Sequence, residues 1–249
     1  MPELIWAFCH ESELVGNWPF RIIPTATHSQ TIKIQWFGHS AFLLTSSRGT
    51  KVLMDPHGRG IAQEEIFPHV VTTSHLHRNH SFIWMAKGNP LVLHGLNPRT
   101  EDWNRIHRTV RDVSIYTVPT YHDSEMGLAR GKNAVFVVAM DGICIAHLGD
   151  LGHLLNEAQI KMMGKIDVLL VPLGQGGYRI TSEDAAKVVA QVKPRVAIPY
   201  HYRWEGFADE FAKGFSRVRK INENFAQFSK DTLTHEMEII VLKDPIEYQ

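Results

Sequence analysis

Ser74-His75-Leu76-His77-Arg78-Asn79-His80 places three histidines within six residues. The Val and Thr residues at 70–73 predict a strand, so the histidines should follow its C-terminal end. In an extended segment, residues two apart point to the same side, and His75 and His77 can therefore bind one ion together. His80, after a turn, is placed to bind a second ion. Neutral imidazole is the commonest metal ligand, which favours a metal site here. The alternative is a polar loop in which the histidines cluster by chance, because the chain has 15 histidines.

The composition excludes some classes of protein. The 249 residues carry 26 basic and 26 acidic side chains, and this balance predicts no nucleic-acid or membrane partner, although a local basic patch stays open. No stretch reaches about 18 apolar residues, and the N-terminus lacks the features of a signal peptide. Cys9 and Cys144 lie far apart, so we expect no disulfide framework and a cytoplasmic location.

Alternating and apolar stretches predict many short strands. We expect strands over 31–37, 41–45, 51–54, 91–94, 113–119, 133–140, 143–146, 168–171, 196–199 and 236–242. We expect helices over 81–87, 100–108, 156–163, 181–192 and 207–220. The pattern predicts one domain over 1–249, with two sheets in the middle and helices outside. Residues 1–30 read as an irregular extension that wraps the domain or forms a homo-oligomer contact.

Four more residues of ligand type each follow a predicted strand, namely Asp55, His122, Asp150 and His201. Strands whose ends share one edge would gather these side chains into one pocket. We expect two ions, Zn²⁺ or Mn²⁺, each with room for a water, as a catalytic site requires. The first would be bound by His75, His77 and His122, and the second by His80, Asp150 and His201, with Asp150 placed to bridge both.

The ordered set of motifs resembles the metallo-β-lactamase superfamily of hydrolases. The resemblance is closest to the group that includes the L-ascorbate-6-phosphate lactonases and related metal-dependent hydrolases. It spans about residues 31–205 and rests on Trp36-Phe37-Gly38-His39-Ser40-Ala41-Phe42, Leu53-Met54-Asp55-Pro56, Ser74 to His80, His122-Asp123, the Gly127–Gly131 region, His147-Leu148-Gly149-Asp150, Val171-Pro172-Leu173-Gly174 and Ile198-Pro199-Tyr200-His201-Tyr202. The resemblance implies an αββα four-layer sandwich with the metal site at the sheet edge.

Asn79 departs from the family motif, which is usually His-x-His-x-Asp-His. In the family that Asp helps to hold the second metal and can take a proton from the bridging water. An amide is a poorer ligand than a carboxylate and cannot serve as an anionic base. We therefore expect an occupied first site and a weaker second one. The alternative is a second ion held by His80, Asp150 and His201, with Asn79 contributing a carbonyl oxygen or a hydrogen bond. Proton removal would be left to the metals, to Asp150 or to a relay through His153.

Several further residues have two interpretations. His39 could contact substrate or support a ligand, or it could be a buried histidine bonded to a strand end. Asp55 is expected to orient a ligand histidine rather than to bind metal. His57 is expected at the surface, with a place in the wall of the pocket as the alternative. Tyr202 could donate to a developing oxyanion or pack in the core.

The sequence thus predicts a metal-dependent hydrolase that uses an activated water on an ester, lactone or related bond of a small molecule. A phosphodiesterase or nuclease on the same fold is the alternative reaction. A non-catalytic metal-binding module is the alternative class, and Asn79 is the feature that favours it.

Overall fold

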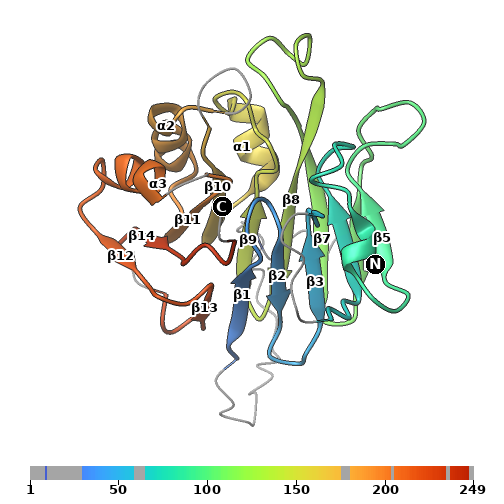
Figure 1. Cartoon of the computed structure of the whole chain (residues 1–249), viewed down its shortest axis with the longest axis horizontal. Coiled ribbons are helices and arrows are strands. Elements are labelled where there is room, and N and C mark those ends of the chain that lie inside the picture. Colours follow the sequence, from blue (N-terminus) through green and yellow to red (C-terminus); the bar gives the residue numbers. More distant parts are fainter. Residues whose placement is uncertain are drawn as a thin grey trace, which may run out of the picture.

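Two β-sheets form the centre of the molecule (Figure 1). The computed structural model describes residues 9, 30–58, 65–174, 180–202, 205–233 and 236–246. Within these ranges the first sheet has the order β13-β1-β2-β3-β4-β5, with strands Phe225–Phe228, Ile32–Trp36, Phe42–Thr45, Lys51–Met54, Val70–Thr73 and Leu91–His94. The second has the order β12-β14-β11-β10-β9-β8-β7-β6, with strands Val218–Lys220, Glu238–Val241, Val196–Tyr200, Val168–Pro172, Ile143–His147, Lys132–Met140, Val113–Tyr121 and His107–Val110.

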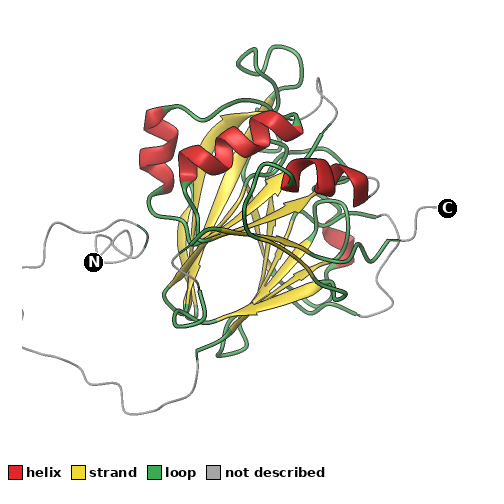
Figure 2. Cartoon of the chain, turned by 90° about the vertical axis from the view of Figure 1, so that its left-hand side faces the viewer, coloured by secondary structure: helices red, strands yellow, loops and turns green. Residues whose placement is uncertain are grey.

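The two sheets pack face to face (Figure 2), and alternation along the strands explains why. On β1, Ile32, Ile34 and Trp36 are buried in the main core between the sheets, while the side chains between them are partly exposed. Successive side chains of a strand point to opposite faces. Leu43 of β2 and Leu53 of β3 therefore point the other way, into a second apolar cluster on the outer face of the first sheet.

The outer faces of the two sheets carry unequal helical layers. Three of them, α1 (Glu157–Met163), α2 (Ser182–Val192) and α3 (Glu205–Ala212), lie beside the second sheet (Figures 1 and 2). The first sheet is covered by the 3-10 turn η1 (Ile83–Met85), whose Met85 belongs to the outer apolar cluster. This layering confirms the predicted αββα sandwich, with one helical layer reduced to a short turn. No helix among the described residues is long and apolar enough to span a membrane.

Three predicted helices differ from the structure. Residues 81–87 form only the turn η1, and the helix predicted over 207–220 ends at Ala212, before β12. No helix forms over 100–108, because Trp103 holds this segment extended. The indole Nε1 of Trp103 donates to the carbonyl oxygens of Thr120 and Asn133. The backbone of Trp103 forms an isolated antiparallel β-bridge with that of Leu96. The chain then enters β6, which pairs with β7. Strands β6, β12 and β13 were not predicted.

A disulfide joins Cys9 to Cys144 of β9, so the prediction of no disulfide is wrong. The two cysteines are separated by 135 residues, and only the fold brings them together. The carbonyl of Cys9 also accepts a hydrogen bond from Lys165 N. Because disulfides are rare in reducing compartments, this bond counts against the cytoplasmic location, which stays a prediction. The rest of the irregular extension, apart from Gln30, lies outside the described residues.

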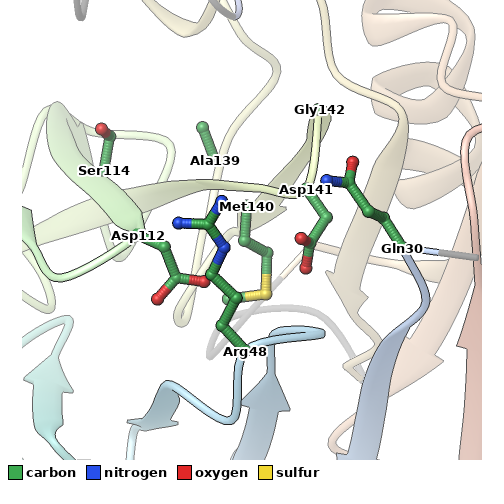
Figure 3. Close-up of a pocket in the computed structure, with 8 residues that line it drawn as sticks. All are labelled: Gln30, Arg48, Asp112, Ser114, Ala139, Met140, Asp141 and Gly142. Atoms are coloured by element: carbon green, nitrogen blue, oxygen red, sulfur yellow. The ribbon is translucent and has the colours of Figure 1, made fainter. Parts of the chain in front are cut away.

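Polar contacts close one end of the sandwich. The hairpin turn between β2 and β3 reaches the other sheet, where Ser46 Oγ donates to Asp112 Oδ2 at 2.7 Å and Ser47 N donates to Asp141 Oδ2 at 2.7 Å. A pocket at this end is lined by Gln30, Arg48, Asp112, Ser114, Ala139, Met140, Asp141 and Gly142 (Figure 3). These turns precede β3, β7 and β9, so the C-terminal ends of those strands lie at the opposite end.

Candidate metal centre

The predicted donors converge at the C-terminal ends of the strands. Strand β4 is followed by the three-histidine motif, and β7, β9 and β11 are followed by His122, Asp150 and His201. Strands β9, β10 and β11 are parallel neighbours, and β3 and β4 are parallel in the facing sheet. Since parallel strands end at the same edge, side chains from distant parts of the chain meet there.

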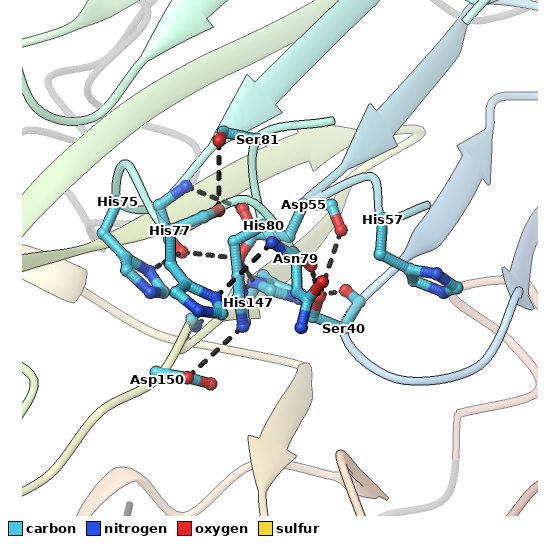
Figure 4. Close-up of polar contacts among 12 residues, drawn as sticks. Ser40, Asp55, His57, His75, His77, Asn79, His80, Ser81, His147 and Asp150 are labelled. Atoms are coloured by element: carbon cyan, nitrogen blue, oxygen red, sulfur yellow. Dashed lines mark hydrogen bonds and ion pairs between the residues drawn. The ribbon is translucent and has the colours of Figure 1, made fainter. Parts of the chain in front are cut away.

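Asp150 lies at the middle of this cluster. Its Oδ2 atom is 3.3 Å from His80 Nε2 (Figure 4) and 3.1 Å from His122 Nε2. Its Oδ1 atom is 3.3 Å from His201 Nε2. Two ligand atoms on a tetrahedral zinc with bonds of about 2.1 Å lie about 3.4 Å apart, so these spacings fit donors of a shared ion.

Among the described residues, three sets of donors are close enough to hold an ion. Within each set the ligand atoms lie within 4.8 Å of one another. The sets are His75, His122 and Asp150; His75, His77 and His80; and His39, His80 and His201. The structure thus brings together all six of the predicted metal ligands, and the division between two ions stays a prediction.

The hydrogen bonds of His75 provide a test of whether these donors suit a metal. The Oγ–H group of Ser74 donates to the carboxylate of Asp55, so the contact of 2.9 Å between Ser74 Oγ and His75 Nδ1 requires the ring to donate. His75 Nε2 then carries a lone pair, and this buried atom has no hydrogen-bond partner. A buried acceptor without a partner is costly. The residues present therefore fit a cation at this position.

Asp55 lies behind His80 and orients it. His80 Nδ1 is 2.8 Å from Asp55 Oδ2 and both side chains are fully buried. Because a carboxylate can only accept, His80 Nδ1 donates and Nε2 faces Asp150. Asp55 Oδ1 also accepts from Ser74 N at 2.6 Å. Burial acts to raise the pKa of Asp55, but His147 and His80 outweigh it and lower that pKa.

Electrostatics keep most of the donors in their metal-binding forms. Burial acts to raise the pKa of Asp150, but His80 and His201 hold it well below its usual range, so the carboxylate is ionised. Burial, aided by His80, lowers the pKa of His75 to about 3. Burial also acts to lower the pKa of His80, but Asp150 and Asp55 raise it to about 9. An ion would therefore have to displace the proton that His80 carries at neutral pH.

Two glycines let the Asp150 loop approach the other donors. A Cβ atom on Gly149, at φ +61°, would lie 2.3 Å from Asn133 Oδ1, the atom that accepts from Asp150 N at 3.0 Å. A Cβ on Gly152 would lie 2.3 Å from the main chain of His122. A side chain at Gly149 would displace Asn133, which positions Asp150, and one at Gly152 would displace the main chain of His122.

Three residues of the site have left-handed backbone conformations, namely His39 (φ +48°), Asp55 (φ +42°) and His201 (φ +66°). Such conformations are uncommon for residues other than glycine, and they persist where surrounding contacts hold them. His57 supplies some of those contacts, since its Nε2 lies 2.8 Å from the carbonyl oxygen of Gly38. His57 is buried, so its predicted surface position is wrong.

Two predicted site residues are engaged elsewhere. His153 Nε2 accepts from Tyr121 N at 3.1 Å and Nδ1 contacts the carbonyl oxygen of Leu154 at 2.7 Å, so both ring nitrogens bond the main chain. This leaves neither nitrogen for the expected proton relay. Tyr202 is buried, packs against Trp36 and donates to the carbonyl of Leu242 at 3.4 Å. The structure therefore places Tyr202 in the core, which is one of the two roles predicted from the sequence.

Asn79 lies in the turn between His77 and His80. Its carbonyl oxygen accepts from Ser40 Oγ at 3.0 Å, and its N–H lies 3.4 Å from His77 Nδ1. His77 is exposed and Asn79 is partly exposed. The centre is therefore open to solvent on the side of this turn.

Some residues that support the centre were not assigned roles from the sequence. They are Ser40 and Ser74, which bond the rings of His39 and His75, Asn133, which positions Asp150, and His147, whose Nε2 contacts the carbonyl oxygen of Ser40 at 3.0 Å. The position of Ser40 directly after His39, and of Ser74 directly before His75, was the only signal in the sequence.

Comparisons with known proteins agree with this geometry. The family described as the beta-lactamase superfamily domain matches residues 33–201. A UPF0173 metal-dependent hydrolase from Archaeoglobus fulgidus is 29% identical over 242 residues, covering 88% of this chain and 99% of its own. One from Thermococcus onnurineus is 31% identical over 211 residues, covering 73% of this chain and 91% of its own.

A solved structure is also similar. A Thermotoga maritima protein, assigned to the Zn-dependent hydrolases of the metallo-beta-lactamase superfamily, is 34% identical with a TM-score of 0.67. The match covers 85% of this chain and 98% of that one. With a family match over most of the chain and a relative above 30% identity, the protein belongs to the metallo-beta-lactamase superfamily and, within it, to the UPF0173 metal-dependent hydrolase family.

Proposed function

We propose that this protein is a metal-dependent hydrolase that cleaves an ester or lactone bond of a small molecule. The observation that carries the proposal is the buried Asp150 carboxylate, which lies within 3.3 Å of imidazole nitrogens from three separate segments. The relatives are named metal-dependent hydrolases, which supports the same class of reaction. The choice of an ester or lactone rests on the sequence resemblance to lactonases.

The donor set suits a divalent ion such as Zn²⁺ or Mn²⁺. When bound, such an ion supplies a Lewis acid and an activated water. His75, His77 and His122 would hold one ion and His80 and His201 a second, with Asp150 placed to bind both. Asp55 and Ser74 keep the rings of His80 and His75 turned toward the centre.

Asp150 acts as a ligand and a counter-charge rather than as a base. In the metal-free chain its pKa lies well below the usual range because His80 and His201 outweigh the effect of burial. A bound cation would favour the ionised form in the same way, and a carboxylate with a low pKa is a weak proton acceptor. Asn79 cannot accept a proton either. The proton of the attacking water would therefore pass to solvent, which reaches the centre beside the exposed His77.

The same residues could serve a phosphodiesterase, because a carbonyl and a phosphoryl oxygen are polarised in the same way. A neutral formal charge weighs against long nucleic acids, whose binding depends on Lys and Arg contacts to phosphates. A small substrate is therefore favoured for either reaction.

The proposal is tested with a panel of lactone, ester, phosphodiester and β-lactam reporters. The protein is stripped with a chelator and then reloaded with Zn²⁺ or with Mn²⁺. We expect ester or lactone turnover that is lost on stripping and restored on reloading. Asp150→Ala should abolish it. His94→Ala, which changes a histidine of β5 that bonds Thr73 of β4, should retain it. Bound metal without turnover of any reporter would contradict the proposal and favour the non-catalytic class.

A further inference from the structure

We infer that His39 is a ligand of the second ion, in place of the carboxylate that Asn79 does not supply. This inference rests on the metal centre that the proposed function requires. His39 lies outside the three-histidine motif at 75–80. A ligand at His39 explains how the second site can be complete without an acid at position 79.

The hydrogen bonds of Ser40 fix the tautomer of His39. Ser40 Oγ lies 3.1 Å from the carbonyl oxygen of Asp55 and 3.0 Å from that of Asn79. A carbonyl oxygen can only accept, so the single hydroxyl hydrogen of Ser40 is used there. The contact of 3.0 Å between His39 Nδ1 and Ser40 Oγ then requires the ring to donate. The lone pair of His39 is therefore on Nε2, the atom a metal would bind.

The ring of His39 lies against the donors of the second ion. Its centroid is 3.7 Å from that of His201 and 5.2 Å from that of His80. One nitrogen of each of these three rings lies within 4.8 Å of the others. His80 Nε2 and His201 Nε2 are 3.3 Å apart, close to the spacing of about 3.4 Å between two ligands of a tetrahedral zinc.

The backbone around His39 is held in place. Trp36 Nε1 donates to the carbonyl oxygen of His39 at 3.1 Å, and His57 Nε2 contacts the carbonyl oxygens of Phe37 and Gly38 at 3.1 and 2.8 Å. His39 itself is buried and has a left-handed backbone. A preorganised ligand has to be held in position by its surroundings. These contacts hold the buried imidazole of His39 beside those of His80 and His201.

Replacing a carboxylate by an imidazole also changes which metal is favoured. Three imidazoles and the shared Asp150 carboxylate form a nitrogen-rich set, which suits Zn²⁺ better than Mn²⁺. An acid at position 79 would add the oxygen ligand that Mn²⁺ prefers. The second site of this chain should therefore select Zn²⁺ more strongly than its Asn79→Asp variant does.

The test is metal content and affinity, measured without substrate. Stripped protein is titrated with Zn²⁺ against a competing chelator, and bound zinc is counted by elemental analysis. We expect two ions in the natural chain and in His94→Ala, and one in His39→Ala. The second-ion affinity of His39→Ala should fall by more than the roughly 10- to 100-fold typical of losing an outer partner. The double variant His39→Ala/Asn79→Asp should regain the second ion, because the carboxylate returns.

Two tight ions in His39→Ala would overturn the role of His39 and leave the metal centre standing. One ion in the natural chain would also overturn it, and no ion would refute the metal centre itself. Should His39→Ala fail to fold by circular dichroism, anomalous diffraction from zinc-loaded natural protein decides the question. An ion at about 2.0–2.1 Å from His39 Nε2 supports the inference, and a second ion without that contact overturns it.

Discussion

His80 Nδ1 lies 2.8 Å from Asp55 Oδ2, with both side chains fully buried. This contact joins the end of β3 to the turn after β4 and leaves His80 Nε2 facing Asp150 at 3.3 Å. The orientation of one imidazole is thus set by a carboxylate that is not itself among the candidate ligands.

Asp55→Asn should weaken metal binding while keeping the shape of the side chain. The amide removes the anionic acceptor that His80 and Ser74 share, so the His80 ring loses its fixed tautomer. We expect a loss of roughly 10- to 100-fold in zinc affinity, as for other partners of metal-bound histidines. Chelator competition measures it, with circular dichroism as the check on folding. An unchanged affinity would show that Asp55 does not orient His80.

Gly149→Ala should damage both stability and the centre. The new Cβ would lie 2.3 Å from Asn133 Oδ1 and 2.6 Å from Ser74 Cβ. Gly49→Ala is the matched control, because Gly49 also has a positive φ (+79°) but has nothing within 4 Å of a Cβ. We expect Gly149→Ala to lose about 1–3 kcal/mol more of the free energy of unfolding than Gly49→Ala. Equal losses in urea unfolding would mean that the loop can move without cost.

The stability of the metal-free protein should be greatest near pH 6.5. Asp150 and Asp55 outweigh burial and raise the pKa of His80 from 6.5 to about 9. The folded state therefore keeps a proton that the unfolded chain loses, and this stabilisation, full below pH 6.5, disappears as the pH rises through about 9.

Acid should destabilise the metal-free protein through other histidines. Burial lowers the pKa of His75 to about 3 and also lowers those of His39 and His147. Below pH 6.5 these histidines bind protons in the unfolded chain but stay neutral in the folded state, so the free energy of unfolding falls. Urea unfolding of chelator-treated protein over the range from about pH 5 to about pH 10 checks both limbs. His80→Gln should reduce the loss of stability between pH 6.5 and 9. A natural chain whose stability rises over that range would contradict the raised pKa of His80.

Reducing the bond between Cys9 and Cys144 should destabilise the fold, because it closes a loop of 135 residues. The chain-entropy account gives a loss of about 4–5 kcal/mol for a loop of this size. Urea unfolding with and without a reductant measures it. Cys144→Ser should show the same loss, and the reductant should have no further effect on that variant. A natural chain indifferent to the reductant would mean that the bond adds no stability.

Much of the centre could be predicted because its donors follow strands. The apolar strands before Asp55, His122, Asp150 and His201 were recognisable from side-chain periodicity, and strands of two packed sheets end at a common edge. The convergence of these residues follows from that arrangement, so the sequence was enough to name the ligand candidates.

The hydrogen bonds around the donors could not be predicted in the same way. Ser40 and Ser74 act through a tautomer, which depends on contacts between segments distant in sequence. The engagement of His153 with the main chain of Tyr121 is likewise visible only in three dimensions. Trp103 prevented a predicted helix because its indole finds buried carbonyl oxygens, an effect of tertiary structure that local propensity does not contain.

Anomalous diffraction at the zinc edge, from crystals of the zinc-loaded natural protein, tests the metal centre most directly. We predict one peak among His75, His122 and Asp150 and a second among His80, His201 and Asp150. Crystals that contain zinc elsewhere, with no peak beside Asp150, would contradict the account.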